Sequence, residues 1–192
     1  NRGNVLFTAD PPEHTRHRRL LNVALKRSAI DRIKDDIDLI ARQAVGSIER
    51  GTVIDLNKAL AVPVPIHCLA TLLGVPRAYT DDFHRWAEAI NASIGSAMSE
   101  DKIREVIQDQ MDFWSFFEAE IVSREQAPGQ DLLSTIATAT SAIDAPLTLS
   151  EKVGFCSQLI GAGADTTTKL IGFATLAMAQ DQSLQDELRQ SP

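Results

Sequence analysis

Residues 148–180 read TLSEKVGFCSQLIGAGADTTTKLIGFATLAMAQ, and this stretch decides the fold. Thr148 and Glu151 have the spacing of a capping box, in which each side chain satisfies a backbone N–H of the first helical turn. No proline follows before Gln180. The pattern predicts one long central helix over about 149–180, and at a rise of 1.5 Å per residue it would be about 45 Å long. We expect the other elements to pack around it.

The middle of this stretch is a poor helix former. Gly161–Ala164 and then Asp165–Thr168 combine glycine, which costs about 1 kcal/mol inside a helix, with threonine, which is a mediocre helix former. Small residues at mid-helix are typical of close helix packing, and they would also let a bulky flat ligand approach the backbone. A membrane span is disfavoured, because Asp165 and Lys169 would each cost about 2.5–3.5 kcal/mol near its centre.

The composition predicts one globular domain. Of the 192 residues 44% are hydrophobic, and the net charge is −7 with a pI near 5.1. This acidity argues against nucleic-acid binding, which needs a basic surface to neutralise phosphates. Neither a signal peptide nor a membrane segment is evident, so a cytoplasmic protein is expected. Cys68 and Cys156 lie in apolar helical surroundings, where a free thiol packs as a small hydrophobe.

A second informative stretch lies near the N-terminus. Asp10 is predicted to cap a helix that begins at Pro11 and runs to about Lys26. At helical spacing His14 and Arg18 head an apolar stripe that continues along the same face. A cation on an inward face needs an anion, which would be either a buried carboxylate of the protein or an anionic cofactor.

The remaining chain also reads as helical, with almost no strand signal. Ser28 is expected to begin a helix that buries a stripe of isoleucines and closes at Gly51. Further helices are expected over about 57–73, 80–94, 99–124, 131–140 and 181–190. His67 and Cys68 are predicted to be core residues, and no metal site is predicted. The fold class is therefore all-α.

Two segments resemble one family. Ala162–Thr167, AGADTT, resembles the central-helix signature of the cytochrome P450 haem-thiolate monooxygenases, and Asp10–Arg19, DPPEHTRHRR, closely resembles the segment that opens the helix beside the haem in bacterial members. The resemblance implies the helical part of a mainly-α fold. It also implies a haem-dependent monooxygenase that activates dioxygen and hydroxylates a small organic substrate. The alternative is a non-catalytic all-α fragment or pseudoenzyme that binds a ligand or a partner.

The resemblance also assigns roles to residues. It assigns the catalytic role to Asp165 and Thr166, an acid and an alcohol that would supply protons during the activation of dioxygen. As contacts of a haem b cofactor it places His14 and Arg18 on the propionates and Ala162, Gly163 and Thr166 against the ring. The implied substrate pocket includes Gln158, Ala162 and Thr166.

The resemblance covers residues 1–192 as one incomplete domain, the central part of a family member. The N-terminal sheet region and the C-terminal loop with the iron-ligating cysteine are missing from the match, so neither Cys68 nor Cys156 is assigned to iron. The loop 95–98 would belong to a lid over the substrate. The basic residues Arg16–Arg19, Lys26 and Arg27 would face a ferredoxin-type electron donor, or would simply be a solvated surface.

Overall fold

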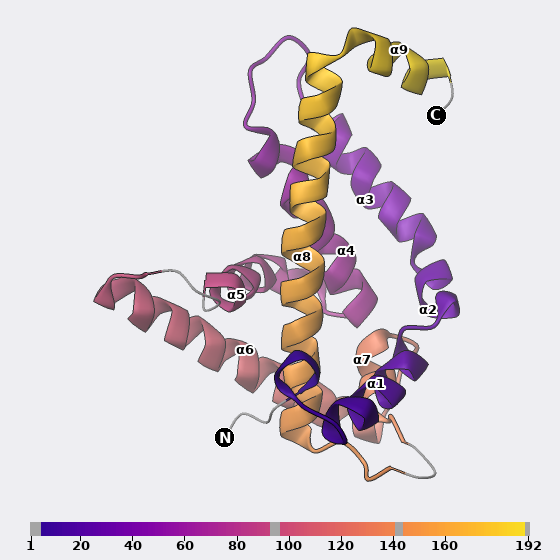
Figure 1. Cartoon of the computed structure of the whole chain (residues 1–192), viewed down its shortest axis with the longest axis vertical. Coiled ribbons are helices and arrows are strands. Elements are labelled where there is room, and N and C mark those ends of the chain that lie inside the picture. The colour runs from indigo at the N-terminus through magenta and orange to yellow at the C-terminus, as the bar shows by residue number, and fades with distance from the viewer. Residues whose placement is uncertain (1–4, 93–96, 141–143, 191–192) are drawn as a thin grey trace.

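The computed structural model describes residues 5–92, 97–140 and 144–190, and within these ranges every regular element is helical (Figure 1). The all-α prediction is therefore confirmed. The elements are η1 Leu6–Thr8, α1 Glu13–Ala24, α2 Arg27–Arg32, α3 Lys34–Gly46, η2 Asn57–Ala61, α4 Pro63–Leu73, η3 Arg77–Tyr79, α5 Thr80–Ala92, α6 Glu100–Gln126, α7 Leu132–Ala137, α8 Leu149–Gln180 and α9 Gln182–Gln190.

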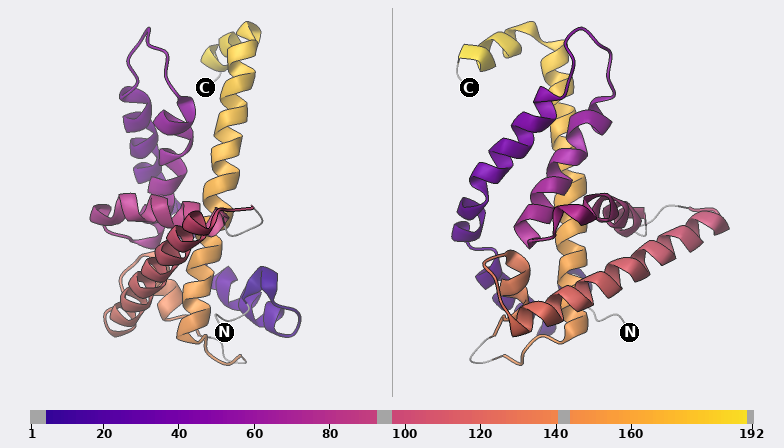
Figure 2. Two further views of the ribbon diagram at one scale, coloured as in Figure 1. Left: turned by 90° about the vertical axis from the view of Figure 1, so that its left-hand side faces the viewer. Right: turned by 180° about the vertical axis from the view of Figure 1, so that it is seen from behind.

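The long helix α8 is the axis of the fold, and it has the predicted bounds. Its capping box is present: the Thr148 hydroxyl accepts from the Glu151 N–H at 3.2 Å, and the Thr148 N–H donates to Glu151 Oε2 at 2.7 Å. Helix α5 packs against both α4 and α6, and all three pack against α8 (Figures 1 and 2). Helix α1 lies beside the N-terminal half of α8, and α9 turns off at its far end.

The main core forms where α5 and α6 meet α8. Phe83, Trp86, Phe113 and Phe117 are buried there, and the rings of Phe113 and Phe117 lie 4.6 Å apart. Aromatic side chains bury large areas, and tilted ring pairs add about 0.5–1.5 kcal/mol beyond that burial. This aromatic cluster packs against the N-terminal half of α8, where Val153, Cys156 and Ile160 belong to the same core.

Buried ion pairs fix the N-terminal half of α8. Lys152 is buried, and its ammonium donates to Glu125 of α6 at 2.6 Å and to the Ala137 carbonyl of α7 at 2.5 Å. Because a buried charge without partners is costly, these bonds define how α8 sits on α6 and α7.

The start of α1 differs from the prediction. The helix begins at Glu13, and Pro12 is its N-cap residue, with no side-chain cap. Asp10 contributes its backbone carbonyl, which accepts from the His14 N–H at 3.0 Å. The two prolines occupy the entry to the helix, so the aspartate side chain is not the group that satisfies the first turn.

The expected helix from Ser28 to Gly51 is also wrong in detail. The chain leaves helical geometry at Ile33, which separates α2 from α3, and α3 ends at Gly46. Arg32 of α2 donates to the Gln130 carbonyl near α7 at 2.9 Å, a tertiary contact that local periodicity does not encode. Of the predicted stripe only Ile40 is buried, and Ile30 is 44% exposed.

Two smaller predictions concern α4 and the loop before α6. His67 is exposed on the surface of α4 rather than in the core, while Cys68 is half-buried. Of the predicted lid loop, residues 95 and 96 lie outside the described ranges. None of the described helices is long and apolar enough to cross a bilayer.

Glycines of α8 allow a matched test of packing. A Cβ on Gly154 would lie 2.7 Å from Cγ2 of buried Val5, whereas a Cβ on Gly172 would meet only ordinary contacts. Gly172→Ala should raise the free energy of unfolding by about 1 kcal/mol, because alanine is the better helix former. Gly154→Ala should lower it by about 1 kcal/mol or more, since overpacking outweighs that gain.

Urea denaturation of the two variants and the parent chain measures both effects. Equal stabilisation by the two substitutions would show that Val5 does not pack against α8 as described.

Candidate functional site: a cavity between α1 and α8

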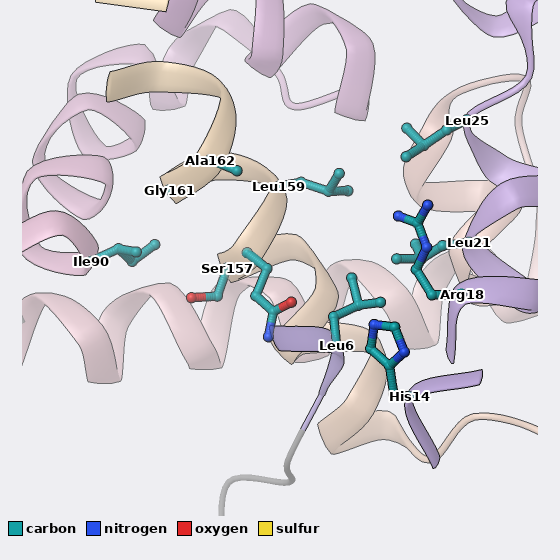
Figure 3. Close-up of a pocket in the computed structure, with 11 residues that line it drawn as sticks. Leu6, His14, Arg18, Leu21, Leu25, Ile90, Ser157, Leu159, Gly161 and Ala162 are labelled. Carbon is teal, nitrogen blue, oxygen red and sulfur yellow. The ribbon is translucent and has the colours of Figure 1, made fainter. Parts of the chain in front are cut away.

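A cavity of about 800 Å³ lies between α1 and the middle of α8 (Figure 3). Most of its wall is apolar, and polar side chains occur mainly along the α1 edge and on one turn of α8. It can therefore take a large apolar body that carries polar groups at one edge. The lining residues are Leu6, His14, Arg18, Leu21, Leu25, Ile90, Ser157, Gln158, Leu159, Gly161 and Ala162.

His14 and Arg18 form the basic edge of the cavity. They stand one turn apart on α1, so their side chains reach the same wall as Leu21 and Leu25, as the periodicity predicted (Figure 3). Among the described residues no carboxylate lies within ion-pair distance of Arg18. Its neighbours are paired, Arg16 with Glu13 and Glu151, and Arg19 with Asp144 at 3.4 Å. A guanidinium facing a cavity in this way is suited to bind a carboxylate of a ligand.

The small residues of α8 face two different surroundings. Gly161 and Ala162 line the cavity, and a Cβ on Gly161 would lie 3.1 Å from Cγ2 of Ile90 on α5. Gly163 faces another direction, where a Cβ would lie 3.0 Å from Cδ2 of Leu69 on α4. Close helix packing is therefore present at Gly161 and Gly163, and the approach of a ligand at Gly161 and Ala162 stays a prediction.

Asp165 and Thr166 lie one turn beyond the cavity. The Thr166 hydroxyl donates to the Ala162 carbonyl at 2.6 Å, the back-bond expected of a mid-helix threonine. Asp165 pairs with Lys169 at 2.5 Å and lines a separate cavity of about 270 Å³ together with His84 and Glu88 of α5. Neither Gly163 nor Thr166 is among the residues that line the large cavity, so their roles at a cofactor or substrate stay predictions.

Of the predicted pocket residues, Gln158 and Ala162 do line the large cavity. The Gln158 amide also donates to the Val5 carbonyl, so it ties the N-terminal lead to α8. This explains a polar residue in an apolar wall, because part of the amide is already satisfied by the protein.

Sequence reasoning missed a polar junction below the cavity. His17 is fully buried, and its Nε2 lies 2.9 Å from Glu151 Oε1, which also pairs with Arg16. The Leu6 N–H donates to His17 Nδ1 at 3.3 Å, so Nε2 carries the proton that points at the carboxylate. The sequence offered one sign of this junction. Glu151 was predicted to cap α8 with one carboxylate oxygen, which left its other oxygen without an assigned partner.

The environment of Glu151 favours its ionised form. Burial alone would raise the pKa of the carboxyl group, but hydrogen bonds from His17 and Thr148 and the charge of Arg16 outweigh it and lower the pKa to about 2. Glu13, His17 and Glu151 have metal-ligand types at close range among the described residues. Because Arg16 is bonded to both carboxylates, the cluster is better described as an ion-pair network than as a metal centre.

The two cysteines are remote from this chemistry. Cys156 is buried and Cys68 half-buried, and burial raises the pKa of both thiols. Neither lines the large cavity. Since a thiolate is the form that binds a metal, these thiols are unsuited to ligate iron there.

Comparison with known proteins now gives the family. No family model matches the chain. The polyketide biosynthesis cytochrome P450 PksS of Bacillus subtilis is 28% identical over 189 residues, which cover 97% of this chain and 45% of that protein. The ligand-free structure of cytochrome P450 TbtJ1 superimposes with a TM-score of 0.88 at 29% identity, covering 97% of this chain and 49% of that one. Over nearly its whole length the chain is similar to cytochrome P450 proteins.

The crystal structure of CYP109E1 from Bacillus megaterium in complex with testosterone is similar at a TM-score of 0.87 and 28% identity, over 98% of this chain and 50% of that chain. The chain thus spans about half the length of the cytochrome P450 proteins it matches. The two motifs that suggested the family, on α1 and α8, face each other across the large cavity or lie directly beside it.

The pKa of Glu151 predicts how stability depends on pH. A carboxyl group whose folded pKa is depressed contributes stability that is present above its unfolded pKa, ordinarily near 4.5, and is lost as the pH falls toward about 2. Glu151→Gln keeps a capping residue but removes the charge. We expect the variant to be less stable than the parent at pH 6 and the difference to shrink as the pH falls through this window.

Urea denaturation at a series of pH values between about 6 and 2.5 gives the comparison, within the window set by the two pKa values. A stability difference that stays constant across this range would mean that Glu151 is not ion-paired in the folded state.

Proposed function

We propose that residues 1–192 are one incomplete domain, the central part of a haem-dependent monooxygenase that hydroxylates a small organic substrate with dioxygen. The observation that carries this proposal is the cavity edge of α1, where Arg18 and His14 face an apolar space without a carboxylate partner among the described residues. The kinship with cytochrome P450 proteins supports the same reaction class.

The residues present fit the cofactor that this function requires. Haem is a flat apolar ring with two carboxylates on one edge, and the cavity offers apolar walls, a close approach at Gly161 and Ala162, and two basic groups at one edge. A cysteine outside this chain would supply the iron ligand, because Cys68 and Cys156 are not on the cavity wall. When bound, haem b would supply the activation of dioxygen.

The chain's own residues have separable tasks in this proposal. Arg18 and His14 would bind the two carboxylates and fix the orientation of the ring. Leu21, Leu25 and Leu159 would exclude water from its faces. Thr166 would hold a water at its hydroxyl oxygen, which can still accept after donating to the Ala162 carbonyl, and Asp165 would exchange protons with solvent at the smaller cavity that it lines.

The substrate would be a small, mainly apolar organic molecule. CYP109E1 has been crystallised with testosterone and with corticosterone, and PksS is named for polyketide biosynthesis. In this chain the substrate would contact Gln158 and Ala162 in the cavity wall and Thr166 one turn beyond it. The Ser157 hydroxyl, which also lines the cavity, would add one hydrogen-bonding group.

A ferredoxin-type electron donor would dock on the basic surface around α1. The structure narrows this surface, because Arg16 is only 15% exposed and is paired with Glu13 and Glu151. Arg18, Arg19, Lys26 and Arg27 are exposed cations there, and Arg18 also lines the cavity. Charges of this kind mainly raise the rate of association with an acidic partner, and salt screens them.

Haem retention by the complete protein tests the proposed function. Arg18→Ala removes a charge-assisted bond worth about 1.5–3 kcal/mol, so haem transfer to apomyoglobin should be about 10- to 100-fold faster. Arg19→Ala is the matched control, because Arg19 pairs with Asp144 and does not line the cavity. It should leave the transfer rate unchanged.

The reduced carbon monoxide difference spectrum of the same protein should show the thiolate-type Soret band. If that band is missing and no haem is bound, the non-catalytic ligand-binding alternative is favoured. Equal transfer rates for the parent and Arg18→Ala would instead assign Arg18 to a partner within the protein.

Thr166 allows a test of the proton-handling role. A positioned proton donor typically contributes about 10²–10⁴-fold, so Thr166→Ala should lower product formed per electron consumed by about tenfold or more, with the loss appearing as hydrogen peroxide. Haem content and substrate affinity should stay close to the parent. Thr166→Ser keeps the hydroxyl and should restore most of the coupling, whereas Asp165→Asn should slow turnover.

Oxygen uptake, peroxide and product measured together give this ratio. Parent-level coupling in Thr166→Ala would leave the hydroxyl with only its structural bond to the preceding turn.

A further inference from the structure

The junction of His17, Arg16 and Glu151 joins three separate walls of the large cavity. His17 and Arg16 belong to α1, which carries His14 and Arg18. Glu151 belongs to the first turn of α8, whose next turns form the opposite wall. Leu6, which donates to His17 Nδ1, lines the cavity from the N-terminal lead. One cluster of hydrogen bonds therefore links three of the segments that line the cavity, and α5 lines it separately through Ile90.

The two carboxylate oxygens of Glu151 bind different partners. Oε2 accepts from the Thr148 N–H at 2.7 Å and from the Thr148 hydroxyl at 3.0 Å, so it completes the helix cap. Oε1 accepts from His17 at 2.9 Å and from Arg16. The His17 ring also packs edge-on against Phe155 of α8, with the centroids 5.4 Å apart. The imidazole is thus fixed at both nitrogens and at its edge.

Backbone packing alone does not set the distance between α1 and α8. Closely packed backbone neighbours of α1 are α7 and η1, while α8 packs mainly against α4, α5, α6 and η2. The large cavity occupies space between α1 and α8. Helices separated by a cavity can shift relative to each other unless a specific contact spans the gap. Two contacts span the gap: a buried apolar cluster, in which Leu20 and Leu21 of α1 pack with Phe155 of α8, and the junction. The junction is the polar one, and it lies next to the basic edge, since Arg18 follows His17 directly and His14 precedes it by three residues.

We propose that Glu151, with His17 and Arg16, is a positioning unit that sets α1 at the distance from α8 at which His14 and Arg18 meet the carboxylates of the cofactor. The identity of that cofactor as haem rests on the proposed function. The unit does not touch the cofactor itself. Its effect on cofactor binding passes through Arg18 and His14.

Glu151→Gln in the complete protein tests the unit, because glutamine can still cap α8 while the charge that holds Arg16 is lost. Haem transfer to apomyoglobin should become about tenfold faster, the loss expected for weakening hydrogen bonds to a charged group. Thr148→Ala is the control, because it removes the side-chain cap and leaves Oε1 with its partners. It should lower stability yet keep the transfer rate within about twofold, since its effect is confined to the helix end.

A double-mutant cycle separates positioning from general destabilisation. If Glu151 acts through Arg18 and His14, then Glu151→Gln should add no further haem loss in a background that carries both Arg18→Ala and His14→Ala, because both residues that it positions are already gone. If the two fold-changes multiply, or if Thr148→Ala speeds transfer as much as Glu151→Gln, the positioning role is overturned.

Hydrogen exchange of α1 in the haem-free complete protein gives a readout that does not depend on the cofactor. Amides of α1 should exchange faster in Glu151→Gln than in the parent, and those of α5 and α6 should not change. If the parent protein takes up no haem, the proposed function fails, and this exchange then decides the inference. Faster exchange confined to α1 supports the unit, and unchanged exchange overturns it.

Discussion

The carboxylate of Glu151 is the constraint on which the arrangement around the cavity depends. A helix start leaves backbone N–H groups without partners, and the capping box satisfies them with a side chain that has two acceptor oxygens. Only one of those oxygens is needed for the cap. In this chain the other faces α1, where a buried imidazole and a guanidinium bind it. The residue that caps α8 thereby also makes a long-range contact, because His17 and Glu151 are 134 positions apart in the sequence.

Ion pairs divide the arginines of α1 into two groups: those that pair with carboxylates of the protein, and Arg18, which lines the cavity. Arg16 is committed to Glu13 and Glu151, and Arg19 to Asp144. Arg18 lies between them in sequence but turns toward the cavity, with no such partner among the described residues. The helical repeat of 3.6 residues produces this division, because adjacent residues point about 100° apart. Three arginines within four positions can therefore tie down the helix and still present a cation to a ligand.

The parts of the fold that sequence could predict are those fixed by local chemistry. The start of α8 followed from Thr148 and Glu151, and its length followed from the absence of proline before Gln180. The facing of His14 and Arg18 followed from helical spacing. The break at Ile33 and the buried state of His17 could not be predicted, because each depends on a partner about 100 residues or more away: Gln130 for α2 and Glu151 for His17. Hydrophobic periodicity predicts the faces of a single helix, whereas each of these contacts joins two separate segments of the chain.

Helix α8 borders two different cavities. Ala162 borders the large cavity, whereas Asp165 borders a different and smaller one that it shares with His84 and Glu88. Asp165 lies three residues after Ala162, so the two side chains point only about 60° apart, on neighbouring faces of the helix. In the proposed function, a substitution around the smaller cavity would alter the supply of protons, and one around the larger cavity would alter the choice of ligand. The two properties would then be separate targets of natural selection, although both depend on adjoining turns of one helix.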